Sequence, residues 1–514
     1  STLILTLFPY TTLFRSIRMN KKAFSLAIIV SMATTGAFAS DVVSTSVNNG
    51  DKLTKLQKEA IQLTQQQLAQ KASQDAQQYE VALNLNEDST VSLALANNRT
   101  AKQSLWDYQA AKATVSATAA GKNPNVSYTW QGARNHGANT MTGRTVTSKT
   151  GQHSFTIKAP VFSPELDANI DKSRFAREGS GAAYEEALQQ AKYDAINGYY
   201  TLIMYRNKVD VANQAVKDYQ GHVDNVKAQY NVGLVANSDV LAADTNLADS
   251  QTNLVKAQNA ANLAEANLNL VIAYPTQTSI TTAEHDLQYK PYAVTLEQAK
   301  AYAMLHRSAL VQSAMAVKQA EEGLKAEKAG YLPTVGVEAG RGYADPDGYF
   351  GTSSKSWHIG ASATWSLWDG GQTQNKIKVA QDTLEKAKEA NLAAVDKVNL
   401  AVQQAYLNLR SAEQTIQSTQ TAVNQGQENF RIATLRYRAG VGTNLDVLDA
   451  ETKLTESRNN YVDALYNYNV SISALEQATG IPLDTPVGQG ASIIANSGAV
   501  EQLAALATAT PAKK

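Results

Sequence analysis

Residues 230–275 recur at 437–482 without a gap, and this duplicated stretch decides the fold. The first copy begins Tyr230-Asn-Val-Gly233-Leu-Val-Ala-Asn-Ser-Asp239-Val240-Leu241, and the second begins Tyr437-Arg-Ala-Gly440-Val-Gly-Thr-Asn-Leu-Asp446-Val447-Leu448. Each central glycine lies between two long stretches without proline, so each copy is predicted to be a helical hairpin that bends at the glycine. A duplication of this length predicts two copies of one large structural unit.

The helices that lead into the two bends are predicted to be unusually long. Residues 165–232 and 371–439 contain no proline, and a helix of that length extends roughly 100 Å. The returning helices repeat a large residue every seven positions, at Val447, Leu454, Tyr461, Tyr468 and Leu475 and again at Val240, Leu247, Leu254, Ala261 and Leu268. In the second copy a small residue follows three positions later, which predicts close coiled packing. For any single helix, an ordinary bundle core is the alternative.

A pair of β-strands is predicted before each long helix, because the residue pattern there alternates with period two. The expected strands are 125–131 and 154–159 in the first copy, and 334–338 and 358–365 in the second. The Gly-, Asn-, Thr- and Ser-rich stretches between them, 132–150 and 339–356, are predicted to be exposed loops.

The N-terminal region has the three parts of a secretory signal. Met19-Asn-Lys21-Lys22 is a basic start, residues 23–32 are apolar, and Ala37-Phe38-Ala39 is a cleavage motif, so cleavage is expected after Ala39. The apolar run is shorter than the ~20 residues of a membrane-spanning helix, which is the alternative interpretation. Residues 1–18 precede the expected initiator Met19 and carry no weight in the argument.

Five segments follow from these patterns. They are residues 1–39, an upstream segment plus signal peptide; 40–88, a helical or partly ordered N-terminal extension; 89–290 and 291–482, the two structural repeats of helices plus two strands; and 483–514, a C-terminal tail.

Composition and motifs exclude several classes of function. The 46 acidic and 46 basic residues are scattered, so no basic stripe points to nucleic acid. The absence of cysteine removes disulfides, thiolate metal sites and a lipid-modified N-terminal cysteine. The six histidines are isolated and no catalytic motif is present, so we expect no enzyme, no catalytic residues, no metal site and no cofactor.

Four motifs, in order along residues 89–482, carry a resemblance to a known family. They are Gly330-Tyr-Leu-Pro333, Leu367-Trp368-Asp369-Gly370-Gly371, Tyr230-x-x-Gly233 with Asp239, and Tyr437-Arg-Ala-Gly440 with Asp446-Val-Leu-Asp449. The chain resembles the TolC-type outer-membrane efflux protein family, the outer-membrane factors of tripartite efflux and type I secretion systems. The resemblance implies an α+β membrane protein, a homotrimer in which each protomer gives four strands to a twelve-stranded β-barrel, continued by a long α-helical coiled-coil tunnel in the periplasm.

The implied function is an outer-membrane channel that conducts efflux or secretion substrates from a periplasm-spanning pump complex to the exterior. The implied partners are two further copies, a periplasmic adaptor (membrane fusion) protein, an inner-membrane pump and outer-membrane lipid. Independently, four strands cannot close a barrel, since small barrels begin at about eight strands. Five aromatic residues near the strand ends fit an interfacial girdle: Tyr128, Trp130, Trp357, Trp365 and Trp368. The alternative function is a periplasmic coiled-coil scaffold or adaptor without a pore.

The resemblance also assigns roles at the two bends. It implies that Asp446 and Asp449 are aperture acids that make the channel entrance cation-selective, and rings of like charge select ions by their field. A helix N-cap for Asp446 and a first-turn acid for Asp449 are the simpler alternatives. Tyr437 and Asp239 correspond to the gate latch, expected to be a phenol–carboxylate hydrogen bond.

Two further features concern closure and docking. The best-known family member has an arginine where this chain has Gly442, and Arg436 and Arg438 are the candidate substitutes. The resemblance implies that the turns are tips that contact the adaptor, at Val232, Gly233, Leu234, Ala439, Gly440 and Val441. A C-cap explains the glycines alone but not the exposed Val and Leu beside them.

Overall fold

The computed structural model describes residues 62–66, 83–138, 143, 145–345 and 354–509. The chain divides into two units, residues 1–82 with 277–279, and residues 83–276 with 280–514. In the first unit, residues 62–66 are helical. The expected signal peptide, its cleavage site and most of the expected N-terminal extension lie outside the described residues.

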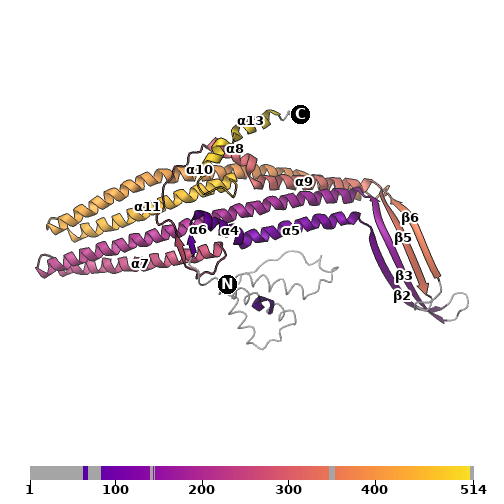
Figure 1. Cartoon of the computed structure of the whole chain (residues 1–514), viewed down its shortest axis with the longest axis horizontal. Helices are drawn as coiled ribbons and strands as arrows, with labels where there is room; N and C mark the ends of the chain where they lie inside the picture. Colours follow the sequence, from indigo (N-terminus) through magenta and orange to yellow (C-terminus); the bar gives the residue numbers. More distant parts are fainter. Residues whose placement is uncertain (1–61, 67–82, 139–142, 144, 346–353, 510–514) are drawn as a thin grey trace. The chain divides into compact units, whose positions relative to one another are not determined.

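The second unit contains both copies of the duplicated pattern, and each has two helices, two long strands and a long helical hairpin in the same order (Figure 1). The first copy runs through β1 (Leu83–Leu85), α4 (Glu87–Asn97), α5 (Arg99–Ala119), β2 (Asn125–Ala138), β3 (Thr145–Phe162), α6 (Pro164–Asn231), α7 (Asn237–Val271) and β4 (Ile280–Thr282). The second runs through α8 (Leu296–His306), α9 (Ser308–Lys328), β5 (Thr334–Asp345), β6 (Ser354–Thr364), α10 (Gln372–Arg438) and α11 (Asn444–Thr479). The short helices α12 (Gly490–Asn496) and α13 (Ala499–Ala509) follow.

The four long strands form one antiparallel sheet in the order β2-β3-β5-β6. The predicted strand pairs are confirmed, but the prediction that 132–150 and 339–356 are loops is wrong in part. β2 continues to Ala138 and β3 begins at Thr145, and β5 continues to Asp345. These extensions carry Gly, Ser and Thr on both faces, so they lack the apolar alternation that indicates a half-buried strand.

The two faces of the sheet differ in chemistry, because successive side chains on a strand point to opposite sides. One face carries Val126, Tyr128, Trp130, Phe155, Ile157, Val337, Trp357 and Ile359 in adjacent register positions. The opposite face carries Ser127, Thr129, Gln131, Ser154, Thr156, Lys158, Glu338, Ser356 and His358. The apolar residues are exposed in the single chain, which predicts that this face meets another apolar phase.

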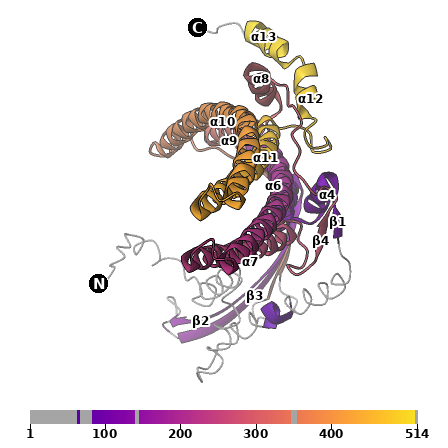
Figure 2. The same cartoon turned by 90° about the vertical axis from the view of Figure 1, so that its left-hand side faces the viewer.

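The long helices are confirmed at 68 residues for α6 and 67 for α10. α6 packs against α7, and α10 packs against α11, so each duplicated bend joins a helical hairpin. The two hairpins lie side by side through contacts between α6 and α11, and the sheet lies at the other end of these helices (Figures 1 and 2). Pro164 occupies the first turn of α6, where its missing N–H leaves no hydrogen bond unmade.

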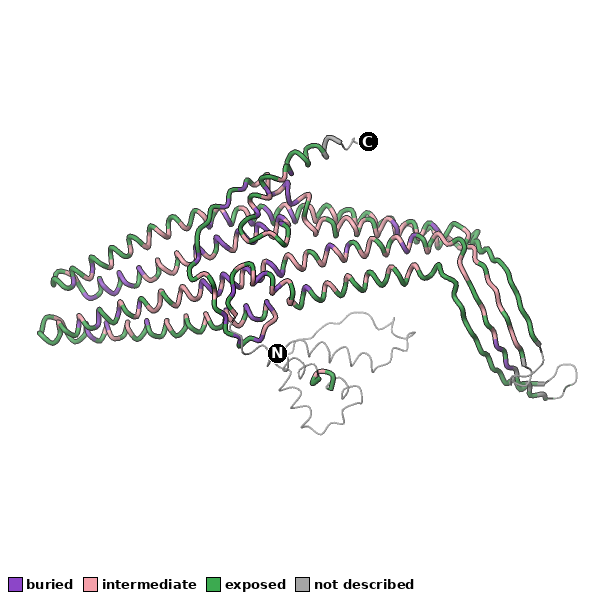
Figure 3. Tube along the Cα trace, in the orientation of Figure 1, coloured by how far each residue is buried: buried purple, intermediate pink, exposed green. Residues whose placement is uncertain are grey.

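Buried residues lie along the long helices, and in the sheet the outer strands β2 and β6 are exposed while the inner strands β3 and β5 are partly buried (Figure 3). The predicted heptad positions Val447, Leu454, Tyr468 and Leu475 are at most 1% exposed. The C-terminal segment is fastened to this core, because Lys192 Nζ donates to the carbonyl of Thr485 at 2.8 Å. In the part of the chain that the structure describes, no helix combines the length and apolarity needed to cross a membrane.

Candidate functional site: the hairpin tips

The two bends have the same backbone geometry, as their common sequence pattern predicts. Gly233 has φ 76° and Gly440 has φ 70°, a left-handed conformation that glycine adopts without steric cost. Leu234 N donates to Gln229 O at 2.9 Å, and Val441 N donates to Arg436 O at 2.9 Å. This pattern of a glycine followed by a bond back over six residues closes a helix C-terminus.

Apolar side chains project from both bends into solvent. Val232 is 70% exposed, Leu234 is 74% exposed and Val441 is 67% exposed. Ala439 is also exposed, and the space beside Gly233 and Gly440 is open. We call residues 232–234 and 439–441 the hairpin tips. Capping accounts for the two glycines, but it supplies no reason for three large exposed apolar residues.

The expected aperture acids lie together at the start of α11. Asp446 and Asp449 are exposed and line one groove between α10 and α11, of about 270 Å³, together with Arg436 and Lys453. The helix N-cap is Thr443, with Asp446 as its partner in a capping box: Asp446 N donates to Thr443 Oγ1 at 3.1 Å, and Thr443 N donates to Asp446 Oδ2 at 2.9 Å. The alternative that Asp446 is itself the N-cap is therefore wrong by three residues.

These hydrogen bonds fix the charge of the acid. The backbone N–H and the hydroxyl of Thr443 hold the pKa of Asp446 below its usual range, and Arg436 adds to this effect. A carboxylate with a lowered pKa stays ionised at neutral and mildly acidic pH. Asp446 therefore offers a constant negative charge in this groove.

The hydrogen bond expected between Tyr437 and Asp239 is absent in this structure. Tyr437 is 4% exposed, and its hydroxyl has no hydrogen-bond partner among the described residues. Burial raises the pKa of the Tyr437 hydroxyl, and the charge of Asp239 raises it further, so the two groups are neighbours without a bond. The phenol packs in an apolar cluster with Val226, Val240 and other side chains of both hairpins.

Two residues that sequence reasoning missed connect the hairpins here. His222 of α6 and Asn444 of α11 form a buried contact, with 2.6 Å between His222 Nε2 and Asn444 Oδ1. Asn444 Nδ2 donates to the backbone carbonyl of Asp239 at 3.1 Å. The rings of His222 and Tyr437 lie 5.1 Å apart. The sequence signal for Asn444 is a polar residue in the first turn of α11, at a position that is buried. Because polar residues commonly follow a helix N-cap, this signal does not single Asn444 out.

Atoms of Arg436 and Tyr437 lie close to Gly442, so the turn leaves little room for a side chain at this residue. A Cβ atom built there would lie 3.1 Å from Tyr437 N and 3.1 Å from Arg436 Cβ. A side chain at residue 442 therefore requires the turn to shift. Arg436 faces the acidic groove, whereas Arg438 lies near enough to His222 to lower its pKa. In the described part of the chain, neither Arg436 nor Arg438 forms a salt bridge, so neither is shown to substitute for the arginine expected at residue 442.

Further polar contacts join α6 and α11 along their length. Tyr219 and Thr452 hydroxyls are 3.0 Å apart, Lys208 pairs with Asp463 at 2.6 Å, and Tyr466 hydroxyl donates to Asn197 at 2.8 Å. Polar contacts of this kind contribute about 0.5–1.5 kcal/mol each. The two hairpins are thus joined by polar contacts in addition to the apolar clusters that they share.

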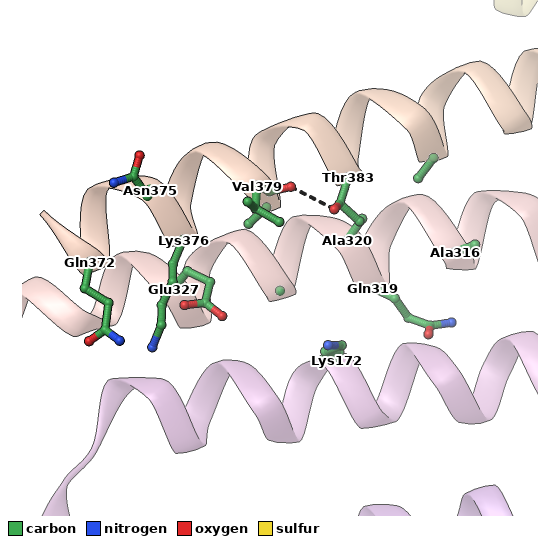
Figure 4. Close-up of a pocket in the computed structure, with 13 residues that line it drawn as sticks. Lys172, Ala316, Gln319, Ala320, Glu327, Gln372, Asn375, Lys376, Val379 and Thr383 are labelled. Atoms are coloured by element: carbon green, nitrogen blue, oxygen red, sulfur yellow. Dashed lines mark hydrogen bonds between the residues drawn. The ribbon is translucent and has the colours of Figure 1, made fainter. Parts of the chain in front are cut away.

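A second hollow lies between α6, α9 and α10, closer to the sheet (Figure 4). It has a volume of about 720 Å³ and is lined mainly by small or polar residues, with Lys172, Glu327 and Lys376 at its wall. It contains no group of side chains suited to catalysis. Among the described residues, no set of three or more His, Asp or Glu side chains is placed to hold a metal ion.

Together, the strands, long helices and paired bends define the fold of an outer-membrane channel protomer, and comparison with known proteins identifies the family. A model of the outer membrane efflux protein family matches residues 90–273 and 301–481. The chain belongs to this family, which is a family of efflux proteins and not of enzymes. The predicted resemblance and the predicted fold class, strands that continue into long helices, are confirmed.

Individual relatives are more distant. The chain is 26% identical over 314 residues to the outer membrane protein TolC of Salmonella enteritidis, covering 58% of this chain and 62% of the relative. It is 24% identical to the outer membrane efflux protein BepC of Brucella suis, covering 57% of this chain and 63% of the relative. The chain therefore spans less than two thirds of the length of these relatives.

Solved structures agree on the fold. The CmeC outer membrane channel of Campylobacter jejuni superposes with a TM-score of 0.68 at 16% identity, covering 80% of this chain and 89% of that chain. At this identity the likeness concerns the fold alone. The roles of the hairpin tips, the acids and the latch in this chain remain proposals.

Proposed function

We propose that this chain is an outer-membrane channel that conducts efflux or secretion substrates from a periplasm-spanning pump complex to the exterior. The observation that carries the proposal is the two-faced sheet. Its apolar face is exposed and aromatic, as a lipid-facing surface requires, and its polar face suits a water-filled lumen. A pore-free coiled-coil scaffold would need no such sheet, so nothing favours that alternative.

The edges of the sheet support a homotrimer. β2 and β6 each have one neighbour among the described strands, so each leaves one edge unpaired. A sheet in lipid must satisfy all of its backbone groups by closing on itself. Three copies of a four-stranded sheet give the twelve strands expected of this family, with β2 of one copy beside β6 of the next. The same symmetry would arrange the hairpins as a continuous helical tunnel.

The tips support the proposed partners. Exposed Val232, Leu234 and Val441 offer apolar contacts to the hairpins of a periplasmic adaptor protein, which would connect the channel to an inner-membrane pump.

Export into the periplasm would use the signal sequence, with cleavage after Ala39. The two acids of each copy would then form two carboxylate rings at the periplasmic entrance.

The proposal is tested with purified full-length protein. Molecular mass in detergent is measured by light scattering, and the same material is added to a planar lipid bilayer. We expect the mass of a trimer and discrete conductance steps with preference for cations. A monomer that produces no conductance steps in the bilayer would contradict the proposed channel function.

A further inference from the structure

The apolar face of the sheet changes character toward the strand ends that lie away from the helices. Toward the helices, one register row contains Val126, Ile157, Ala339 and Ile359, which are all apolar. The next row contains Tyr128, Phe155, Arg341 and Trp357, and the row after it contains Trp130, His153, Tyr343 and Lys355. Two rows further, Arg134 and Lys149 are paired. Cations thus begin where the aromatic residues begin.

These four cations share one face, because each lies an even number of residues from an apolar member of its own strand. We call Arg134, Lys149, Arg341 and Lys355 the cation belt. All four side chains are exposed. They come from all four strands, so the belt follows the sheet across its full width at the level of the aromatic rows and just beyond.

The belt lacks the neutralisation seen on the other face. There, Lys158 pairs with Glu338 at 2.9 Å and His358 contacts the same carboxylate at 3.0 Å. None of the four belt cations forms a salt bridge within the described residues, and Arg341 instead lies over the ring of Tyr343 at 5.2 Å. In the register, Asp345 occupies the row between the row of Lys355 and the row of Arg134 and Lys149. One acidic residue beside four cations leaves the belt with an excess of positive charge.

We propose that the cation belt binds the phosphate groups of anionic lipids in the leaflet that surrounds the strand ends. The inference rests on the proposed function, which places the apolar face in the bilayer. Lipid phosphates lie at the boundary between hydrocarbon and water, the level at which aromatic girdles are found. Arg binds phosphate through paired N–H groups and Lys binds it as a point charge. Because the cation belt lies at the aromatic rows and just beyond them, it would lie at the level of the lipid phosphates.

The test uses the full-length protein in detergent, after its trimer mass and bilayer conductance have been measured. The probe is bisphosphorylated lipid A, compared with the same lipid after removal of its phosphates. The belt variant is Arg134→Gln/Lys149→Gln/Arg341→Gln/Lys355→Gln. Its matched control is Lys102→Gln/Lys112→Gln/Lys217→Gln/Lys256→Gln, which removes four exposed helix lysines that form no salt bridge with any described residue. Each lost cation near a lipid surface is expected to weaken binding about fivefold.

We expect the belt variant to bind the phosphorylated lipid at least tenfold more weakly, with the control unchanged. Equal binding by belt variant and wild type would overturn the inference, as would equal binding of the dephosphorylated lipid. Displacement by the same concentration of inorganic phosphate would also overturn it, since it would show a site for any phosphate. If the belt variant itself does not assemble, the pairs Arg134→Gln/Lys149→Gln and Arg341→Gln/Lys355→Gln are compared separately. A wild-type protein without conductance counts against the channel, independently of the belt.

Discussion

His222 and Asn444 form a buried contact between the two hairpins close to the tips, with 2.6 Å between Nε2 and Oδ1. Because Asn444 Nδ2 is used in its bond to the carbonyl of Asp239, its Oδ1 accepts and His222 Nε2 must donate. His222 Nδ1 is then an acceptor, and it is buried with no hydrogen-bond partner in the described part of the chain. One asparagine therefore holds the start of α11 to both helices of the other hairpin.

Replacing Asn444 with leucine is expected to loosen this junction. Asn444→Leu removes two hydrogen bonds of about 0.5–1.5 kcal/mol each and leaves a histidine and a carbonyl unpaired. If separation of the hairpins opens the entrance, single-channel conductance should rise. Asn460→Leu, an exposed position on the same helix, is the control. Equal conductance in the wild type and Asn444→Leu would show that this contact does not limit opening.

Acidification should act on the same junction. Burial lowers the pKa of His222 below its ordinary value of 6.5, the bond to Asn444 opposes this, and the charge of Arg438 lowers the pKa further. A separated, hydrated histidine takes up a proton near pH 6.5, whereas the packed one does so only at lower pH. Falling pH below about 6.5 therefore favours separation, and the contact is fully stable above that value.

Conductance measured between pH 7.5 and 5 checks this prediction. We expect it to increase on acidification in the wild type and to lose that dependence in His222→Gln, which keeps a polar side chain but does not titrate. Asp446 does not interfere, since its lowered pKa keeps it ionised across this range. A dependence that survives in His222→Gln would assign it to another group.

Tyr437→Phe is now expected to change little. The sequence predicts a hydrogen bond from this hydroxyl to Asp239, but the hydroxyl is buried without a partner among the described residues. Removing an unsatisfied buried polar group is neutral or stabilising, by up to about 1 kcal/mol. Conductance and thermal unfolding should both match the wild type within that margin. A clear rise in conductance would mean that Tyr437 reaches Asp239 in the assembled channel.

The architecture of this chain can be predicted from the sequence because the patterns that indicate it are long and repeated. A duplicated glycine turn, heptads such as Val447 to Leu454, and period-two strands each persist over many residues. The local partners at the bend are not readable, because they depend on which face of α6 meets α11. His222 is one of six scattered histidines, and nothing in the pattern places it against Asn444, which is 222 residues away in the chain.

The turn at Gly442 is a second local feature that could not be predicted from the sequence. The resemblance marks Gly442 as a position where the best-known family member has an arginine. The structure shows backbone 3.1 Å from the site of the first side-chain atom. The local turn has adapted to glycine, so an arginine there would displace the turn before it could pair.

Charge at the entrance is tested by Asp446→Asn/Asp449→Asn. Both substitutions keep the shape of the side chain, and asparagine can still accept the bond from Thr443 N, so the helix start should persist. We expect lower cation selectivity and loss of inhibition by multivalent cations, measured as reversal potential and block in a planar bilayer. Lys453→Gln, in the same groove, should change selectivity in the opposite direction. Unchanged selectivity in the double variant would place the narrowest point elsewhere.

The tips are tested by separating charge from backbone strain at Gly440. Both Gly440→Asp and Gly440→Ala place a side chain at φ 70°, which costs roughly 1 kcal/mol, but only aspartate adds a charge beside exposed Val441. Because the space around Gly440 is open, neither variant should prevent trimer assembly. Export measured in cells should fall strongly for Gly440→Asp and only slightly for Gly440→Ala. Equal loss in both variants would mean that the turn itself matters, and loss of the trimer in both would show that the tips are structural turns instead of a docking surface.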